Sequence, residues 1–290
     1  MRATSFGPTA LLLMACLLWG CSGVSLDLPS SVQPAAQIAA KTGAKAIHAS
    51  RPISDSEEYY VGRAVGARIL AKYPLYQDQE VTRYVNKVGL TVARKSSRPN
   101  PYRGYHFAVL DTPEPNAFAC PGGTILITRG LLKNCATEDE LAAVLAHEVA
   151  HIANKDGIKS ISQARWTEVA TTLGTETAKQ YGGSAGQMVT LFEGSIDDVF
   201  KTIVVNGYSR SAEESADREA VSILRKAGYN PGALAAVLTK MSGKEGAGGI
   251  YRTHPPTSER LAKVQSLAPA SSASSEKEAV RTARFQQLKI

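Results

Sequence analysis

The sequence predicts an α+β fold that is mainly helical and carries a small β-sheet. Long runs of strong helix formers predict the helices, one of which is preceded by a capping box. Two short stretches, residues 105–110 and 124–128, are rich in aromatic and β-branched residues and are typical of strands. With 290 residues, of which 43% are hydrophobic and 20% charged, the chain is long enough for one substantial globular domain.

Residues 1–50 are expected to lie outside that domain. A short apolar run after Arg2 predicts a signal peptide over residues 1–20, because the run is too short to span a bilayer as a mature helix. The segment ends in Leu-Trp-Gly-Cys21, which resembles a bacterial lipoprotein box and predicts lipid attachment at Cys21. Residues 21–50 are rich in Ser, Ala, Pro and Gln, and we expect them to form a flexible tether.

Lipid attachment would also fix where the protein resides. Ser22 rather than an aspartate follows Cys21, and bacterial sorting rules then predict the periplasmic face of the outer membrane. The alternative is an ordinary secreted protein in which the cysteine occurs by chance.

The folded domain is expected to span residues 51–267 and to begin with two helices. Ser54 and Glu57 are spaced as a capping box that opens a helix ending near Lys72. A second helix is expected over residues 78–94, where valines recur at helical spacing. After the two strands and the later helices, residues 268–290 are expected to form a charged tail that frays or makes a loose helix.

The pattern His147-Glu148-x-x-His151 lies within a run of helix formers that begins at Leu141. Residues four apart share one face of a helix, so both histidines can bind one zinc ion. Glu148 then reaches a water on the metal without occupying the metal itself, which is the arrangement of a hydrolytic zinc site. The alternative is a surface helix with two histidines. The apolar neighbours argue against it, because buried histidines and a glutamate are costly without a partner.

Two histidines leave the site one ligand short. No third histidine follows at the spacing of a metzincin, so a carboxylate from a later helix is expected. Glu213 and Asp217 are four residues apart on such a helix, with Glu213 as the third ligand and Asp217 accepting the outer N–H of a histidine. Spacing alone does not choose between Glu213 and Glu214.

These two motifs together resemble the zinc metallopeptidase family of the CAAX prenyl protease and the heat-shock protease HtpX (metallopeptidase family forty-eight). The second motif reads Ser-Arg-x-x-Glu213-x-x-Ala-Asp217. Two further segments carry the resemblance, one from Asn116 to residue 132 and one that reads His254-Pro-Pro-Thr-Ser-Glu-Arg260. The resemblance covers roughly residues 54–267.

The resemblance implies a gluzincin with a zincin-like metallopeptidase domain, in which a small β-sheet lies beside the active-site helix. In that family the glutamate before Ala-Asp is a metal ligand, which favours Glu213. It implies one Zn²⁺ per chain and hydrolysis of peptide bonds by a zinc-activated water, with Glu148 as general base. Asn116 would hydrogen-bond the substrate backbone, and Gly122 and Gly123 would permit its close approach. The alternative for these three residues is a plain loop between strands.

His254 is open to three interpretations. It could donate to the oxyanion, as could Arg252 or Tyr208, or it could occupy the open metal position as a latch until substrate displaces it. We favour the latch. Pro255 and Pro256 stiffen the chain and bias His254 away from helix, as suits a histidine held in a loop near the metal. The third interpretation is a residue at the start of the following helix with no part in the chemistry.

The predicted function is that of a membrane-tethered zinc endopeptidase of the bacterial cell envelope, acting in protein quality control. Its expected partners are protein or peptide substrates, including misfolded envelope proteins, and the membrane through the N-terminal lipid. The alternative is a chaperone or assembly factor for outer-membrane proteins in which proteolysis is secondary. The net charge of +7 is spread along the chain, so no nucleic-acid partner is expected.

Two features remain open. Residues 157–205 are expected to be largely helical with a glycine-rich hinge at 182–186, and we hypothesise that they form a lid over the cleft. Cys120 and Cys135 either form a disulfide, which an oxidising envelope permits, or stay as two buried thiols.

Overall fold

The computed structural model describes residues 53–159, 196–242, 248–268 and 276–290, all of which belong to one compact unit that spans Lys45–Ile290. The expected signal peptide, the tether with Cys21, and the larger part of the expected lid lie outside the described residues.

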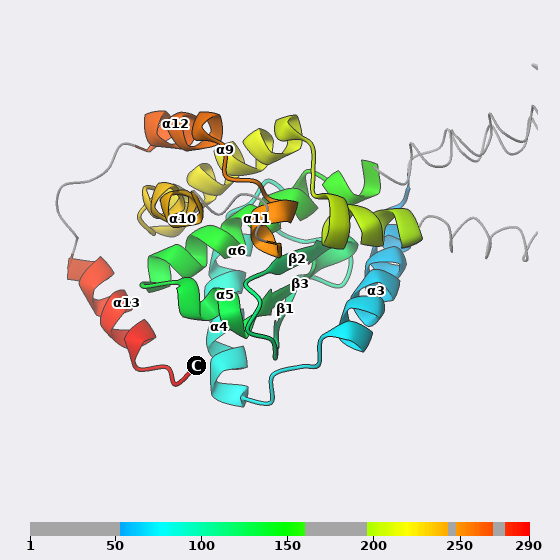
Figure 1. Ribbon diagram of the computed structural model, residues 1–290, viewed down its shortest axis with the longest axis horizontal. Coiled ribbons are helices and arrows are strands. Elements are labelled where there is room, and N and C mark those ends of the chain that lie inside the picture. The colour runs from blue at the N-terminus through cyan, green and yellow to red at the C-terminus, as the bar shows by residue number, and fades with distance from the viewer. Residues whose placement is uncertain (1–52, 160–195, 243–247, 269–275) are drawn as a thin grey trace, which may run out of the picture. The chain divides into compact units, whose positions relative to one another are not determined.

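Helices dominate the described part of the chain, and three short strands form its sheet, which confirms the α+β fold (Figure 1). The elements that position the site are, in chain order, α3 (Asp55–Lys72), α4 (Gln79–Ala93), β1 (His106–Leu110), β2 (Ala117–Cys120), β3 (Thr124–Thr128), α5 (Arg129–Asn134), α6 (Glu138–Ala153), α9 (Arg210–Ala227), α10 (Ala233–Met241), α11 (Ile250–Thr253), α12 (Ser258–Leu267) and α13 (Glu276–Gln286).

The sheet has the order β1-β3-β2, with β1 parallel and β2 antiparallel to β3. β1 and β3 coincide with the two expected strands. β2 was expected to be part of a loop, and that expectation was wrong. Its sequence, Ala-Phe-Ala-Cys, has no β-branched residue and lies between Pro115 and Pro121, so its strand signal is weak. Pairing with β3 and complete burial make it a strand.

Local sequence signals account well for the first two helices. The Ser54 hydroxyl accepts the Glu57 N–H, and the Glu57 carboxylate accepts the Ser54 N–H, so the predicted capping box is confirmed. Gly62 lets α3 approach the turn after β2, because a Cβ there would lie 1.7 Å from the Pro121 carbonyl oxygen. In α4 the expected apolar stripe is buried, at Val81, Val85, Val88 and Val92.

Helix α6 lies at the centre of the fold and packs against α4, α9, α10, α13 and the sheet (Figure 1). Every residue of α6 from Glu138 to Ile152 is buried, which is typical of a helix that is apolar around most of its circumference. The larger core cluster joins α6 to α4, α9, α10 and one face of the sheet. A smaller cluster lies between α3 and the other face. The histidine motif of α6 is therefore held in a fully buried part of the described chain.

The C-terminal residues differ from the loose tail that was expected. They form α13, whose Phe285 is 5% exposed and belongs to the larger core cluster. Arg281 forms a bidentate ion pair with the buried carboxylate of Asp139 at the start of α6, and Arg284 forms one with Glu138. Spacing in the sequence could not reveal this docking, because the partners lie about 140 residues away.

The two cysteines of the folded unit are free and buried. Cys120 belongs to the smaller core cluster and Cys135 to the larger one, so they lie on opposite sides of the sheet. The disulfide alternative is therefore wrong. Among the helices of the described ranges, none combines the length and the apolar character that a membrane span requires.

Candidate metal and catalytic site

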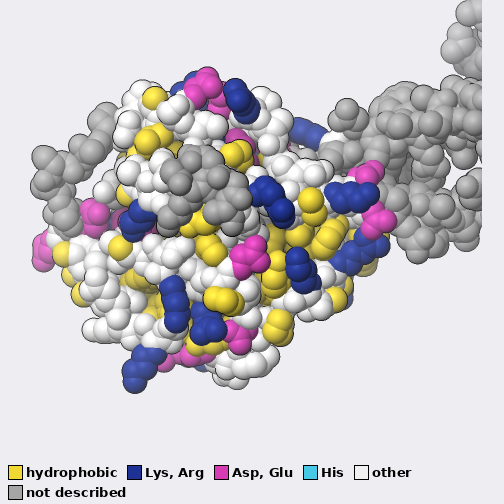
Figure 2. All heavy atoms as spheres, viewed as in Figure 1, with side chains coloured by type: hydrophobic (Ala, Val, Ile, Leu, Met, Phe, Trp, Pro, Cys, Tyr) yellow, Lys and Arg dark blue, Asp and Glu magenta, His cyan; other side chains and the backbone are white. Residues whose placement is uncertain are grey.

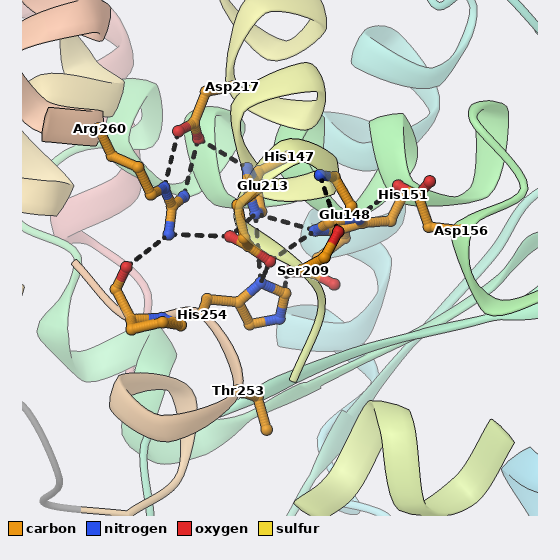
Figure 3. A network of polar contacts seen from close by, with 12 residues as sticks. His147, Glu148, His151, Asp156, Ser209, Glu213, Asp217, Thr253, His254 and Arg260 are labelled. Carbon is orange, nitrogen blue, oxygen red and sulfur yellow. Dashed lines mark hydrogen bonds and ion pairs between the residues drawn. The ribbon is translucent and has the colours of Figure 1, made fainter. Parts of the chain in front are cut away.

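Four buried side chains from three parts of the fold meet at one point: His147, His151, Glu213 and His254 (Figure 3). One ligand atom of each lies within 4.8 Å of those of the others. The two histidines of α6 share a face one turn apart, and their Nε2 atoms are 3.1 Å from each other. The expected pairing of these histidines on one helix face is thus what the structure shows.

Carboxylates hold the outer nitrogens of both rings. Asp217 Oδ1 lies 3.1 Å from His147 Nδ1, in the position the sequence predicted. Asp156 Oδ2 lies 2.9 Å from His151 Nδ1, a contact that the sequence analysis missed. Asp156 lies beyond the end of α6 and directly after Lys155, whose φ of 56° turns the chain back on the helix. These contacts fix the tautomer and direct each Nε2 towards the common point.

Helix α9 resolves the choice between the neighbouring glutamates. Glu213 is 1% exposed, with Oε1 3.3 Å from His151 Nε2 and Oε2 3.3 Å from His147 Nε2. Glu214 instead pairs with Lys263 near the surface. Ala216 and Ala220 are fully buried, and their small side chains allow α9 to lie close to α6. The structure therefore brings Glu213, and not Glu214, to the histidines.

Arg260 of α12 is a residue of the site that the sequence analysis named only as part of a motif. Its guanidinium binds both oxygens of Asp217 at 2.8 Å, and its Nη1 lies 2.8 Å from Glu213 Oε2. Nη1 also donates to the Pro255 carbonyl at 3.0 Å, which ties it to the loop after His254. A buried arginine in contact with two buried carboxylates offsets their charge and holds their geometry. Its burial depends on the packing of α12, so no local signal could have identified it.

The buried charges shift several pKa values. Burial alone would lower the pKa of His147, but its hydrogen bonds to Asp217 and Glu213 outweigh that effect and raise the pKa to about 10. Burial would raise the pKa of Glu213, but the charge of His254 and the hydrogen bonds from the three histidines hold it well below its usual range. Arg260 and His147 overcome burial in the same way and lower the pKa of Asp217 to about 2. The cluster is therefore built to hold positive charge at its centre.

The donor set fits a zinc ion. With both outer nitrogens beside carboxylates, the two Nε2 atoms face each other at 3.1 Å and also face the Glu213 carboxylate. Such an arrangement is satisfied by a cation between the three groups. Two imidazoles and one carboxylate are a common protein ligand set for catalytic zinc.

His254 lies at the same point. As the C-terminal cap of α11 it donates its backbone N–H to Ile250, and its Nδ1 lies 2.9 Å from Glu213 Oε1 and 3.3 Å from His147 Nε2. Its Nε2 faces Glu148 Oε1 at 3.7 Å. Both carboxylate oxygens of Glu148 are buried and have no hydrogen-bond partner among the described residues. The third interpretation of His254, a residue with no link to the site, does not agree with this position.

The other two candidate oxyanion donors are placed differently. The Tyr208 ring stacks on the His151 ring, with centroids 4.1 Å apart, and its hydroxyl points towards Gly157 beside Asp156. Arg252 is exposed and donates to the Val204 carbonyl at 3.3 Å. Of the three, Tyr208 contacts His151 through its ring, and His254 is the one whose ring nitrogen lies against Glu213 and His147.

The predicted substrate-binding residues have internal roles in this structure. Asn116 is 3% exposed, and its side-chain oxygen accepts the Ala117 N–H. Gly122 and Gly123 both have positive φ, and a Cβ at either would lie within 2.5 Å of the chain's own backbone. The close approach that these glycines permit is therefore to α3 and to Gly104. Their contact with substrate stays a prediction.

Comparison with known proteins agrees with this geometry. Residues 79–268 match the sequence model of Peptidase family M48. The chain is 25% identical over 228 residues to the beta-barrel assembly-enhancing protease of Escherichia coli (strain K12), which covers 76% of this chain and 45% of that protein. It is 27% identical over 208 residues to the mitochondrial metalloendopeptidase OMA1 of Schizosaccharomyces pombe, which covers 70% of this chain and 56% of that protein. It is 29% identical over 190 residues to a Protease HtpX homolog of Salinibacter ruber, which covers 55% of this chain and 67% of that protein.

The chain thus spans less than half the length of the beta-barrel assembly-enhancing proteases that it matches in Escherichia coli and Yersinia pestis. The family match, however, covers more than half of this chain and includes α6, α9 and the loop that carries His254. On that match, this chain belongs to peptidase family M48.

Proposed function

We propose that this chain is a zinc-dependent endopeptidase. The observation that carries the proposal is the buried cluster of His147, His151, Glu213 and His254 within 4.8 Å, with the carboxylate of Glu148 directly beside it. Membership of family M48 supports it, as do the names of the relatives, which are proteases and a metalloendopeptidase.

Each residue has a defined part in the proposed reaction. His147, His151 and Glu213 would hold the metal, while Asp217, Asp156 and Arg260 keep those side chains in place. Zinc bound there would supply Lewis acidity to polarise a peptide carbonyl and acidify water. Glu148 takes the proton of the attacking water and delivers it to the leaving amine. Both of its carboxylate oxygens are buried and accept no hydrogen bond from the described residues, so they are available for both steps.

We further propose that the enzyme acts at the periplasmic face of the outer membrane, anchored by a lipid on Cys21, and degrades misfolded envelope proteins. The lipoprotein-like sequence before Cys21 supports the anchor. The relatives from Escherichia coli, Yersinia pestis and Vibrio cholerae whose names refer to beta-barrel assembly support a role in the envelope.

A second candidate function is that of a chaperone or assembly factor for outer-membrane proteins, with proteolysis secondary. The words "assembly-enhancing" in the names of those relatives favour it. Replacing Glu148 by Gln in the cell separates the two: loss of the cellular role supports the peptidase, and its retention supports the assembly factor.

The central prediction is that Glu148→Gln abolishes peptide cleavage but keeps the metal. Removing a general base costs about 10²–10⁴-fold in rate.

The choice of the third ligand gives a second prediction. Glu213→Ala should lose zinc because it removes a ligand. Glu214→Ala should keep both zinc and activity because Glu214 pairs with Lys263 at the surface. Metal content by mass spectrometry and cleavage of an unfolded protein substrate measure the two properties. Zinc loss in Glu214→Ala alone, or full activity in Glu148→Gln, would contradict these assignments.

A further inference from the structure

A cavity of about 240 Å³ lies beside the proposed catalytic site, between α5, α6, α10 and α11. Its walls are mainly apolar, with Leu131, Val144, Val237, Met241, Ile250 and Tyr251 among the lining residues. None of these side chains takes part in the metal cluster. In Figure 2, which has the view of Figure 1, apolar side chains are exposed between charged ones on the face where α10 and α11 lie.

Two walls of the cavity are parts of the catalytic elements. Val144 precedes Glu148 by four residues, so the two share a face of α6 with their Cβ atoms about 5–6 Å apart. Ile250 and Tyr251 belong to the single turn of α11, which ends at His254, and His254 Nε2 is 3.7 Å from Glu148. The cavity thus begins within one helical turn of the proposed general base.

The α11 wall is also fastened to the segment that leads into the terminal strand of the sheet. The Ile250 N–H donates to the Pro115 carbonyl at 2.9 Å, two residues before β2 begins. At Gly249 a Cβ would lie 2.5 Å from the same oxygen, so only glycine allows this approach. The α11 wall of the cavity therefore lies against the segment that leads into β2.

The charge and size of the cavity define what it can take. Lys240 is the one charged residue that lines it in the described part of the chain, and its ammonium is paired with the Glu140 carboxylate at 2.6 Å. Among the described residues that line the cavity, none offers an unpaired charge to an acidic or basic group. Pockets for whole drug-sized ligands measure about 300–1,000 Å³, so a smaller cavity suits one large side chain.

We propose that this cavity is the specificity pocket of the enzyme and receives one large apolar side chain, leucine-like or phenylalanine-like, of the peptide being cleaved. The proposal rests on the proposed function, because it concerns the substrate of the same site. An apolar pocket discriminates by about 10–200-fold in kcat/KM between substrates whose side chains differ by one methylene. One position next to the scissile bond should therefore prefer large apolar residues to Ala or Asp.

The first test uses the zinc-loaded chain and a randomised peptide library whose cleavage products are sequenced. Val237 lies at the partly exposed rim of the cavity, so Val237→Trp fills the cavity with little disturbance of the core. Val237→Trp should replace the preference for large apolar residues at that position of the peptide by a preference for Ala. Ala236→Trp is the matched control, because Ala236 is exposed on the same helix and does not line the cavity. A profile that Val237→Trp leaves unchanged overturns the proposal.

The second test needs no turnover and separates this proposal from the proposed function. The protein is zinc-loaded Glu148→Gln whose methionines carry ¹³C-labelled methyl groups, and the Met241 methyl signal in the NMR spectrum is assigned with Met241→Leu. That signal should shift when N-acetyl-leucinamide is added, and it should not shift when N-acetyl-alaninamide is added. A shift without cleavage by the wild-type chain supports the pocket and refutes the peptidase. Cleavage without a shift supports the peptidase and refutes the pocket. Absence of both refutes both.

Discussion

At the scale of single residues, the position of His254 is the most informative. Its Nδ1 faces Glu213 Oε1 and His147 Nε2, which is where a fourth ligand to the metal would lie. A histidine that only donated to the oxyanion would leave that position to water and substrate. The geometry therefore favours the latch, in which His254 occupies that position until substrate displaces it.

We predict that His254→Ala raises basal proteolysis. If the open form makes up a tenth of the wild-type population, removal of the latch raises the apparent rate about tenfold. Loss of an oxyanion donor would instead lower turnover by about 10²–10³-fold. Initial rates on an unfolded substrate separate the two roles, with Lys263→Ala, an exposed change on α12, as control. An unchanged rate in His254→Ala rules out both roles.

The two cysteines of the folded unit make a second prediction at this scale. Burial raises the pKa of Cys120 to about 12, with a further contribution from the charge of Glu148, and burial likewise raises the pKa of Cys135 to about 12. At pH 8 only about one thiol in 10⁴ is then a thiolate, the reactive form. The native protein should resist iodoacetamide at both positions. After unfolding without reductant, mass spectrometry should find both alkylated, and protection that disappears only with reductant would instead reveal a disulfide.

At the scale of elements, α13 shows how a terminal helix can stabilise an active-site helix. Arg281 and Arg284 pair with Asp139 and Glu138, which are buried acidic residues at the N-terminus of α6. Those carboxylates interact favourably with the positive end of the α6 dipole, but buried charges of this kind require oppositely charged partners. Phe285 completes the contact by entering the core. The N-terminal end of the helix that carries the predicted metal ligands therefore packs against a segment near the end of the chain.

We predict that Phe285→Ala lowers the free energy of unfolding by about 3–5 kcal/mol, the usual cost of truncating a buried phenylalanine. Val280 lies on the same helix and is 60% exposed, so Val280→Ala should change stability by less than about 0.5 kcal/mol. Urea unfolding of both variants gives the comparison. Equal stabilities would show that α13 does not contribute to the core in solution.

At the scale of the whole molecule, the chain separates into two units, Met1–Ala44 and Lys45–Ile290, and the site belongs entirely to the second. Cys21 lies in the first. The proposed anchor and the proposed chemistry are thus on different units, and a change in one need not alter the other.

We predict that Cys21→Ser releases the protein from the membrane fraction and leaves peptide cleavage by the purified chain unchanged. A lipid-modified Cys21 should incorporate labelled palmitate, and the variant should not, because the acyl chains attach through that residue. Fractionation and labelling of both proteins test it. Membrane association that persists in Cys21→Ser would show that another part of the chain binds the membrane.

The sequence by itself determined the features that depend on neighbours a few residues away. The capping box of α3, the buried stripe of α4 and the common face of His147 and His151 follow from helix periodicity, and so does the spacing of Glu213 and Asp217. In each case the partners are three or four residues apart, so local geometry is enough to bring them together. Resemblance to a known family then favoured Glu213 as the third ligand.

Only the tertiary structure decided which side chains face the site from distant segments. Asp156, Arg260 and the orientation of His254 depend on how loops and helices return to α6, and β2 became a strand only by pairing with β3. The docking of α13 is of the same kind. Burial and pairing across a long stretch of chain are properties of the packed whole, because the free energy that fixes such a contact comes from all the segments that exclude water from it.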